Sequence, residues 1–99
     1  MNQSELLDTI QNRLRSNQAN YQPVVLSCLI KNNNSMKSIQ NELAKANNKT
    51  DAKPYGKSCP VWKVLKNKGL IEINQDQIKL LVKVDKLQKP ILKALKEKC

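Results

Sequence analysis

The stretch CPVWKVLKNKGLIEI (residues 59–73) limits most strongly what this chain can fold into. Pro60 stands where the first residue of a helix belongs, because the N–H that proline lacks has no helical partner there. Ser58 or Cys59 would then be the helix cap. Gly69 fits the left-handed conformation that ends a helix. The stretch therefore predicts a short helix that continues into a β-strand. The side chains of this helix that would face the core are Val61, Val64 and Leu65.

Two β-prone runs follow Gly69, and turn-forming residues separate them. LIEI and IKLLVKV flank NQDQ, which is the pattern of a β-hairpin with four connecting residues. Lys79 and Lys83 would share one face of the second strand, because side chains alternate along a strand. Lys89 and Pro90 then open a last helix. Its apolar side would consist of Ile91, Leu92 and Leu95.

The first half of the chain predicts three helices. Asn2 and Glu5 have capping-box spacing, which places the first helix over about residues 3–15. PVVLSCLIKN is apolar on nearly all sides, so it predicts a buried central helix with Pro23 as its first residue. Three asparagines end it, and Ser35 caps an amphipathic third helix. The third helix has inward positions Met36, Ile39, Leu43 and Ala46, and outward positions Lys37, Gln40, Asn41 and Lys45.

Residues 47–58 show no apolar periodicity and include both Pro54 and Gly56. We expect a long loop here, and loops of this length are usually functional or disordered. The lysines at positions 49, 53 and 57 continue the spacing of four residues that begins at Lys45. A helical extension through residue 53 would align them on one face, but Pro54 forbids a longer one.

The composition fits one small domain that carries an uneven positive charge. Hydrophobic residues make up 39% of the 99 residues and aromatic residues 3%, so leucine, isoleucine and valine must form the core. The net charge is +10. Residues 45–99 account for +9 of it, with fourteen lysines against five carboxylates. Such asymmetry favours a polyanionic partner, although a lysine-rich surface that only confers solubility remains the alternative.

Several functional classes are disfavoured. The chain has no histidine, only two glycines, and carboxylates scattered on separate predicted elements, so we expect no enzyme, no metal site and no cofactor. No run reaches the roughly 20 apolar residues of a membrane span, and the N-terminus does not resemble a signal peptide.

An odd number of cysteines predicts a reduced, cytoplasmic protein. Cys28 is expected in the core and Cys99 at an exposed end. Cys59 beside Lys57 could be an activated thiol, but capping or packing is the simpler interpretation.

The segments YQPVVLSCLI, IQNELAKAN, PVWKVLKNKGLIEI and IKLLV resemble winged helix-turn-helix domains. They are similar, more narrowly, to the winged-helix modules attached to bacterial restriction enzymes and to related helicase or nuclease proteins. The resemblance implies a mainly α fold with a small β-hairpin. Residues 21–83 would form the winged-helix core, 1–20 an N-terminal helical extension and 84–99 a C-terminal helix. In this fold one helix enters the DNA major groove and the hairpin wing touches the adjacent backbone.

The predicted partner is double-stranded DNA. Lys63 and Asn67 lie on the outer side of the predicted recognition helix, and lysine and asparagine can read guanine and adenine edges. Lys57 and Ser58 would stand at the N-terminus of that helix, where a phosphate is favoured. Because lysines dominate, we expect backbone neutralisation with modest sequence discrimination. The candidate nucleic-acid-binding residues are Lys37, Lys49, Lys53, Lys57, Ser58, Lys63, Lys66, Asn67, Lys79 and Lys83.

Other interpretations remain open from the sequence. The domain could be an interaction module that docks an acidic protein through the same face. It could form a homodimer through its terminal helices, or be attached to a larger nuclease or helicase protein. Trp62 is either a core ring beneath the wing or an exposed platform on which bases stack. In the second case RNA or single-stranded DNA would be favoured.

Overall fold

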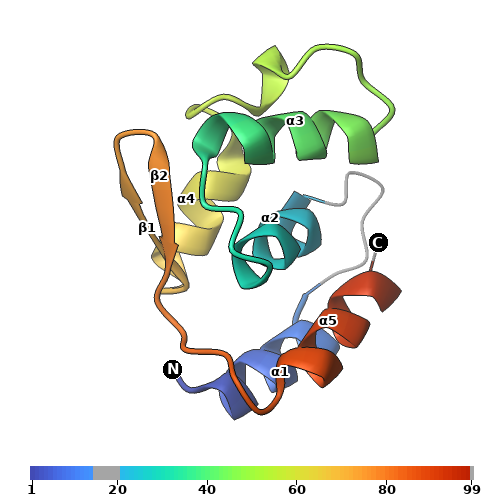
Figure 1. Cartoon of the computed structure of the whole chain (residues 1–99), viewed down its shortest axis with the longest axis vertical. Coiled ribbons are helices and arrows are strands. Elements are labelled where there is room, and N and C mark those ends of the chain that lie inside the picture. The colour runs from blue at the N-terminus through green and yellow to red at the C-terminus, as the bar shows by residue number, and fades with distance from the viewer. Residues whose placement is uncertain (15–20, 99) are drawn as a thin grey trace.

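The computed structural model describes residues 1–14 and 21–98. Figure 1 shows a helical molecule with one small hairpin at its side. This arrangement confirms the predicted class, a mainly helical fold with a two-stranded antiparallel hairpin. The elements are α1 (Gln3–Asn12), α2 (Tyr21–Ile30), α3 (Met36–Ala46), the 3-10 helix η1 (Lys53–Tyr55), α4 (Pro60–Asn67), β1 (Ile71–Asn74), β2 (Gln77–Leu80) and α5 (Gln88–Glu97).

Helix α2 is the central element, as its apolar sequence predicts. It contacts α3, α4, α5 and β2, and it lies between them in Figure 1. The helix begins at Tyr21, so the prediction that Pro23 is its first residue was wrong. Pro23 still lies in the first turn, where N–H groups have no partner within the helix. Cys28 is only half-buried, because it belongs to the side of α2 that no other element covers completely.

Residues that dictate backbone geometry set the ends of several elements. The side chain of Asn2 accepts a hydrogen bond from the Glu5 N–H at 2.9 Å, which confirms the predicted capping box. The side chain of Ser35 accepts one from the Ser38 N–H at 3.3 Å, which confirms the cap of α3. Gly69 has a φ of 72° and follows α4 as predicted. Helix α1 is shorter than predicted, since it ends at Asn12.

Helix α3 buries one side and ends early. Met36, Ile39 and Leu43 are buried as predicted, but the fourth inward position is Ala44, whereas Ala46 is exposed. The chain leaves the helix after Ala46. The helical extension that would align the following lysines therefore does not form, and a loop leads to η1 instead.

The hairpin has a tighter turn than predicted. Asn74 pairs with Gln77, so two residues connect the strands, not four. Strand β2 ends at Leu80, and Lys83 lies beyond it; the prediction that Lys79 and Lys83 share a strand face was therefore wrong. A further bridge joins Ser35, just before α3, to Gln77. Its two hydrogen bonds run from the Met36 N–H to the Asp76 oxygen (2.8 Å) and from the Ile78 N–H to the Asn34 oxygen (2.9 Å).

The terminal helices pack against each other and on the core. Helices α1 and α5 lie side by side, and α5 also contacts α2. Gln3 joins α1 to the start of α5: its Oε1 accepts hydrogen bonds at 3.0 Å from the N–H groups of Asp85 and Leu87. Helix α5 begins at Gln88, one residue before the predicted Lys89. The prediction for Cys99 lies outside the described residues.

Candidate nucleic-acid interface

Helix α4 has one side in the core and one basic side in solvent. Its contacts are with β1 and α2. The buried positions are Val61, Trp62 and Leu65, with Val64 at the margin. Lys63, Lys66 and Asn67 are exposed. Because successive helical residues turn by about 100°, these three side chains share an arc of about 100°. The structure thus confirms the predicted division of this helix.

An aromatic anchor positions α4. Trp62 is 2% exposed, which excludes the stacking platform and confirms the core interpretation. Its Nε1–H donates a hydrogen bond to the Tyr55 carbonyl oxygen at 3.1 Å. The Tyr55 ring is buried and meets Tyr21 edge to face, with centroids 5.5 Å apart. These contacts tie η1, which also packs against α3, to α4 and to the first turn of α2. Sequence reasoning missed Tyr55, although a lone aromatic residue in the polar run KPYGKS was the available signal.

The loop residues next to α4 face solvent. Lys53, Lys57 and Ser58 are exposed on the segment that leads to the first turn of α4. The buried Tyr55 fixes one end of this segment, and a hydrogen bond from the Cys59 N–H to the Gly56 oxygen (2.8 Å) closes the other. Lys57 and Ser58 therefore precede the positive end of the helix dipole, as predicted.

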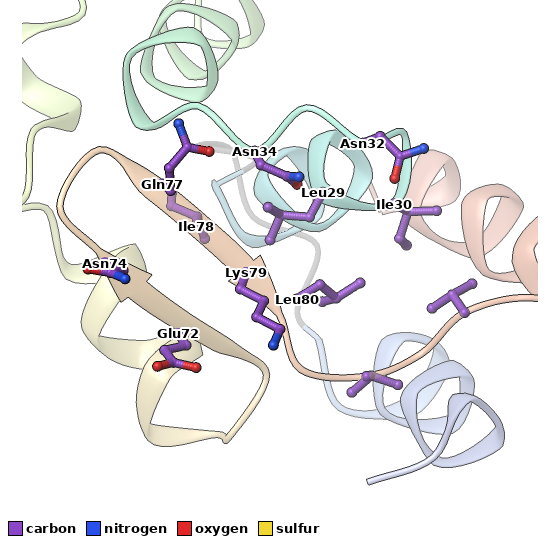
Figure 2. A pocket seen from close by; sticks show the side chains of 12 residues that line it. Leu29, Ile30, Asn32, Asn34, Glu72, Asn74, Gln77, Ile78, Lys79 and Leu80 are labelled. Atoms are coloured by element: carbon purple, nitrogen blue, oxygen red, sulfur yellow. The ribbon is translucent and has the colours of Figure 1, made fainter.

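The hairpin lysines lie elsewhere. Lys79 is the cross-strand partner of Glu72 and lines a hollow of about 580 Å³ between the hairpin and the end of α2 (Figure 2). No residue of α4 lines this hollow. Lys79 thus shares its surroundings with a carboxylate and amides, and the structure does not bring it to the basic side of α4.

The remaining predicted residues stand at separate places. Lys37 is in the first turn of α3, near the hairpin turn, whereas Lys49 follows the far end of the same helix. A helix of eleven residues is about 16 Å long, so these two lysines cannot belong to one cluster. All ten predicted residues are exposed. Those on η1, α4 and the segment between follow one another along the chain, and we call them the α4 surface: Lys53, Lys57, Ser58, Lys63, Lys66 and Asn67.

The possible metal ligands and the cysteines were the other candidate features of the described part of the chain. No group of three histidine, cysteine, aspartate or glutamate side chains could hold a metal ion there. Cys59 is buried beneath the start of α4. Burial, and secondly the Glu42 carboxylate, raises the pKa of the Cys28 thiol, which is the opposite of activation. No helix in residues 1–14 or 21–98 is long and apolar enough to cross a membrane.

Comparisons with family models, with curated proteins and with solved structures found no significant match to this chain. Function must therefore be inferred from the residues themselves. The feature with the clearest chemistry is the α4 surface. It presents four cations, a hydroxyl and an amide on one anchored helix and the segment before it.

Proposed function

We propose that this chain is a winged helix-turn-helix domain that binds duplex DNA with α4 in the major groove. The main support is the exposed side of α4, where Lys63, Lys66 and Asn67 project from a helix whose opposite side is anchored in the core. A recognition helix needs this combination, because its side chains must be both free to contact DNA and held in register.

The order and pairing of the elements support the fold assignment. Helices α2, α3 and α4 precede the hairpin, as in a winged helix. The bridge between Ser35 and Gln77 adds a residue from the α2–α3 connection to the outer edge of β2. This bridge takes the place of a third strand, although it is only one residue long, and it connects the hairpin to the start of α3.

The contacts would be mostly electrostatic. Lys57 and Ser58 precede the positive end of α4, where they can receive a phosphate, and Lys53 extends the basic surface along η1. The hairpin contributes little, because its two-residue turn is bonded to Met36 and does not project as a long wing. Asn67 is the candidate base reader, since an amide can pair with adenine.

The resemblance of the sequence to restriction-associated modules suggests the biological setting. We propose that the domain recognises DNA for a restriction, defence or regulatory protein. In this proposal any catalytic groups would belong to another domain, as the lack of histidine and the scattered carboxylates of the sequence suggest.

The first prediction tests the recognition helix by charge reversal. We expect Lys63→Glu with Lys66→Glu to abolish duplex binding in a gel-shift assay at ~0.15 M salt, where non-specific constants are roughly 0.1 mM to 1 μM. The Kd of the unmodified chain should increase with salt, and single Lys→Gln changes should each lower that slope by about one.

The matched control is Lys79→Glu with Lys83→Glu, which changes the net charge equally but lies on and beyond the hairpin. It should keep most of the affinity. Equal loss in both variants would mean that only net charge matters, and unchanged binding in the α4 variant would remove α4 from the interface. Circular dichroism should show native helicity in both.

A further inference from the structure

The side of α2 opposite its buried face forms a second surface that the proposed DNA contact does not use. Val24, Ser27 and Cys28 are half-buried there, and Lys31 is exposed. Ser27 and Lys31 form a ridge on this side, and a hollow flanks it on either side, one of about 530 Å³ toward α3 and one of about 590 Å³ toward α5. Both are lined by Ser27 and Lys31, so they form one continuous surface. We call it the α2 outer face.

This surface combines an apolar floor with a basic rim. Toward α3 the hollow is floored by Val24, Cys28 and Ala46, and toward α5 by Leu92 and Leu95. Four lysines, from α3, α5 and the turn directly after α2, surround the two hollows, with Glu42 as the one carboxylate among the residues that line them. The rim lysines are Lys31, Lys45, Lys93 and Lys96.

The pattern is informative because solubility alone does not require it. A lysine placed only for solvation can stand anywhere, whereas these four surround apolar hollows on neighbouring helices. Lys93 and Lys96 are three residues apart on α5, so they project on the same side. The floor is mostly apolar, and Ser27 and Asn33 are the neutral polar residues that line the hollows, so the charged phosphates of duplex DNA fit this surface poorly.

We propose that the α2 outer face docks an acidic amphipathic helix of a partner protein. Apolar side chains of that helix would enter the two hollows on either side of the Ser27–Lys31 ridge. Its carboxylates would meet the rim lysines, which would steer the encounter and fix the orientation. Helix α4 contributes no residue to either hollow, so a partner and a DNA duplex could bind together.

The state of Cys28 agrees with a partly dehydrated floor. Its thiol lies in the hollow toward α3, and burial is the main cause that raises its pKa. An apolar side chain that covers this floor removes apolar area from water, and the binding free energy gained is roughly proportional to that area.

The test uses fluorescence anisotropy with a labelled 14-residue amphipathic peptide that has leucines on one side and glutamates on the other. A matched peptide carries glutamine at every glutamate position. We expect the acidic peptide to bind at least tenfold more tightly than the neutral one. Equal affinities, or no binding of the acidic peptide to the unmodified protein, would overturn the proposal.

Two triple variants with the same charge change separate the surfaces. The rim variant is Lys31→Gln, Lys93→Gln and Lys96→Gln. The α4 variant is Lys57→Gln, Lys63→Gln and Lys66→Gln. The rim variant should bind the acidic peptide roughly tenfold more weakly, because three exposed charge pairs are lost. The α4 variant should bind the peptide within about twofold of the unmodified protein.

A labelled duplex distinguishes failure of this proposal from failure of the DNA proposal. The α4 variant should lose duplex affinity and the rim variant should largely keep it. If the rim variant instead loses duplex affinity and keeps peptide affinity, the α2 outer face belongs to nucleic acid and the docking proposal is wrong. Peptide binding with no duplex binding would overturn only the DNA proposal.

A third variant tests the apolar floor. Val24→Ser removes a half-buried apolar side chain from the hollow toward α3 without changing the charge. We expect peptide affinity to fall severalfold, and the amide resonances that shift on peptide addition to lie in α2, α3 and α5. Unchanged affinity together with shifts centred on α4 would overturn the docking site.

Discussion

If the domain binds nucleic acid as proposed, the position of Trp62 bears on whether the ligand is single-stranded, because bases stack on an exposed ring. The ring is buried, and its N–H is bonded to Tyr55. As the only tryptophan, it reports its own surroundings by fluorescence. We expect a blue-shifted emission, weak quenching by acrylamide, and no change in the emission maximum when single-stranded DNA is added. Strong quenching by the oligonucleotide would mean that α4 opens and the ring meets a base.

The two glycines differ in what a side chain would cost. Gly69 has a φ of 72°, and nothing lies within 4 Å of an added Cβ, so only the left-handed backbone opposes substitution. We expect Gly69→Ala to lower the free energy of unfolding by about 1–2 kcal/mol in urea denaturation. Gly56 is the control: its φ is −65°, and a Cβ added there would lie 3.5 Å from the Lys53 oxygen, an ordinary contact. Gly56→Ala should be neutral or slightly stabilising. Equal losses at both sites would contradict the backbone explanation.

At the scale of the elements, the hairpin turn contains a residue with a strained backbone conformation, and a substitution can relieve that strain. Gln75 has a φ of 56°, although it is not glycine. Gln75→Gly should therefore raise the free energy of unfolding by up to about 1 kcal/mol. Gln77→Gly is the matched control, because Gln77 is a strand residue paired with Asn74 and bridged to Ser35. It should destabilise by roughly 0.5–1 kcal/mol. If both changes destabilise, the left-handed residue is not the source of strain.

The elements also show what local sequence can and cannot predict. The ends at Ser35 and Gly69 were predictable, because one residue type satisfies a cap or a positive φ. The length of β2 was not, because it depends on where its partner strand begins: Gly69 ends α4 just before Leu70, whose oxygen accepts the last cross-strand hydrogen bond, from the Leu81 N–H. The burial of Tyr55 was not either, since it requires a ring from α2 that is distant in sequence.

For the candidate site, too, the sequence predicts features within one element but not the contacts between elements. The exposed side of α4 follows from helical periodicity alone, so Lys63 and Asn67 were placed correctly. The neighbours of Lys79 could not be predicted from periodicity, because only the folded molecule shows it beside Glu72 in a hollow that no residue of α4 lines. Periodicity places residues within one element, whereas the neighbourhood of two elements depends on packing.

For the whole molecule, the net charge of +10 makes salt act in opposite directions on folding and on binding. Crowded lysines repel one another in the compact state, and salt screens this repulsion. The same salt would weaken the proposed DNA binding, because counterions released from the phosphates into a more concentrated salt solution gain less entropy. We expect Tm to rise between about 0.05 and 0.5 M NaCl while the Kd for duplex DNA increases steeply. Sodium chloride is preferred to sulfate, which would also strengthen apolar burial. A Tm that falls with salt would mean that favourable ion pairs outweigh repulsion, and the lysines would then be structural and not reserved for a polyanion.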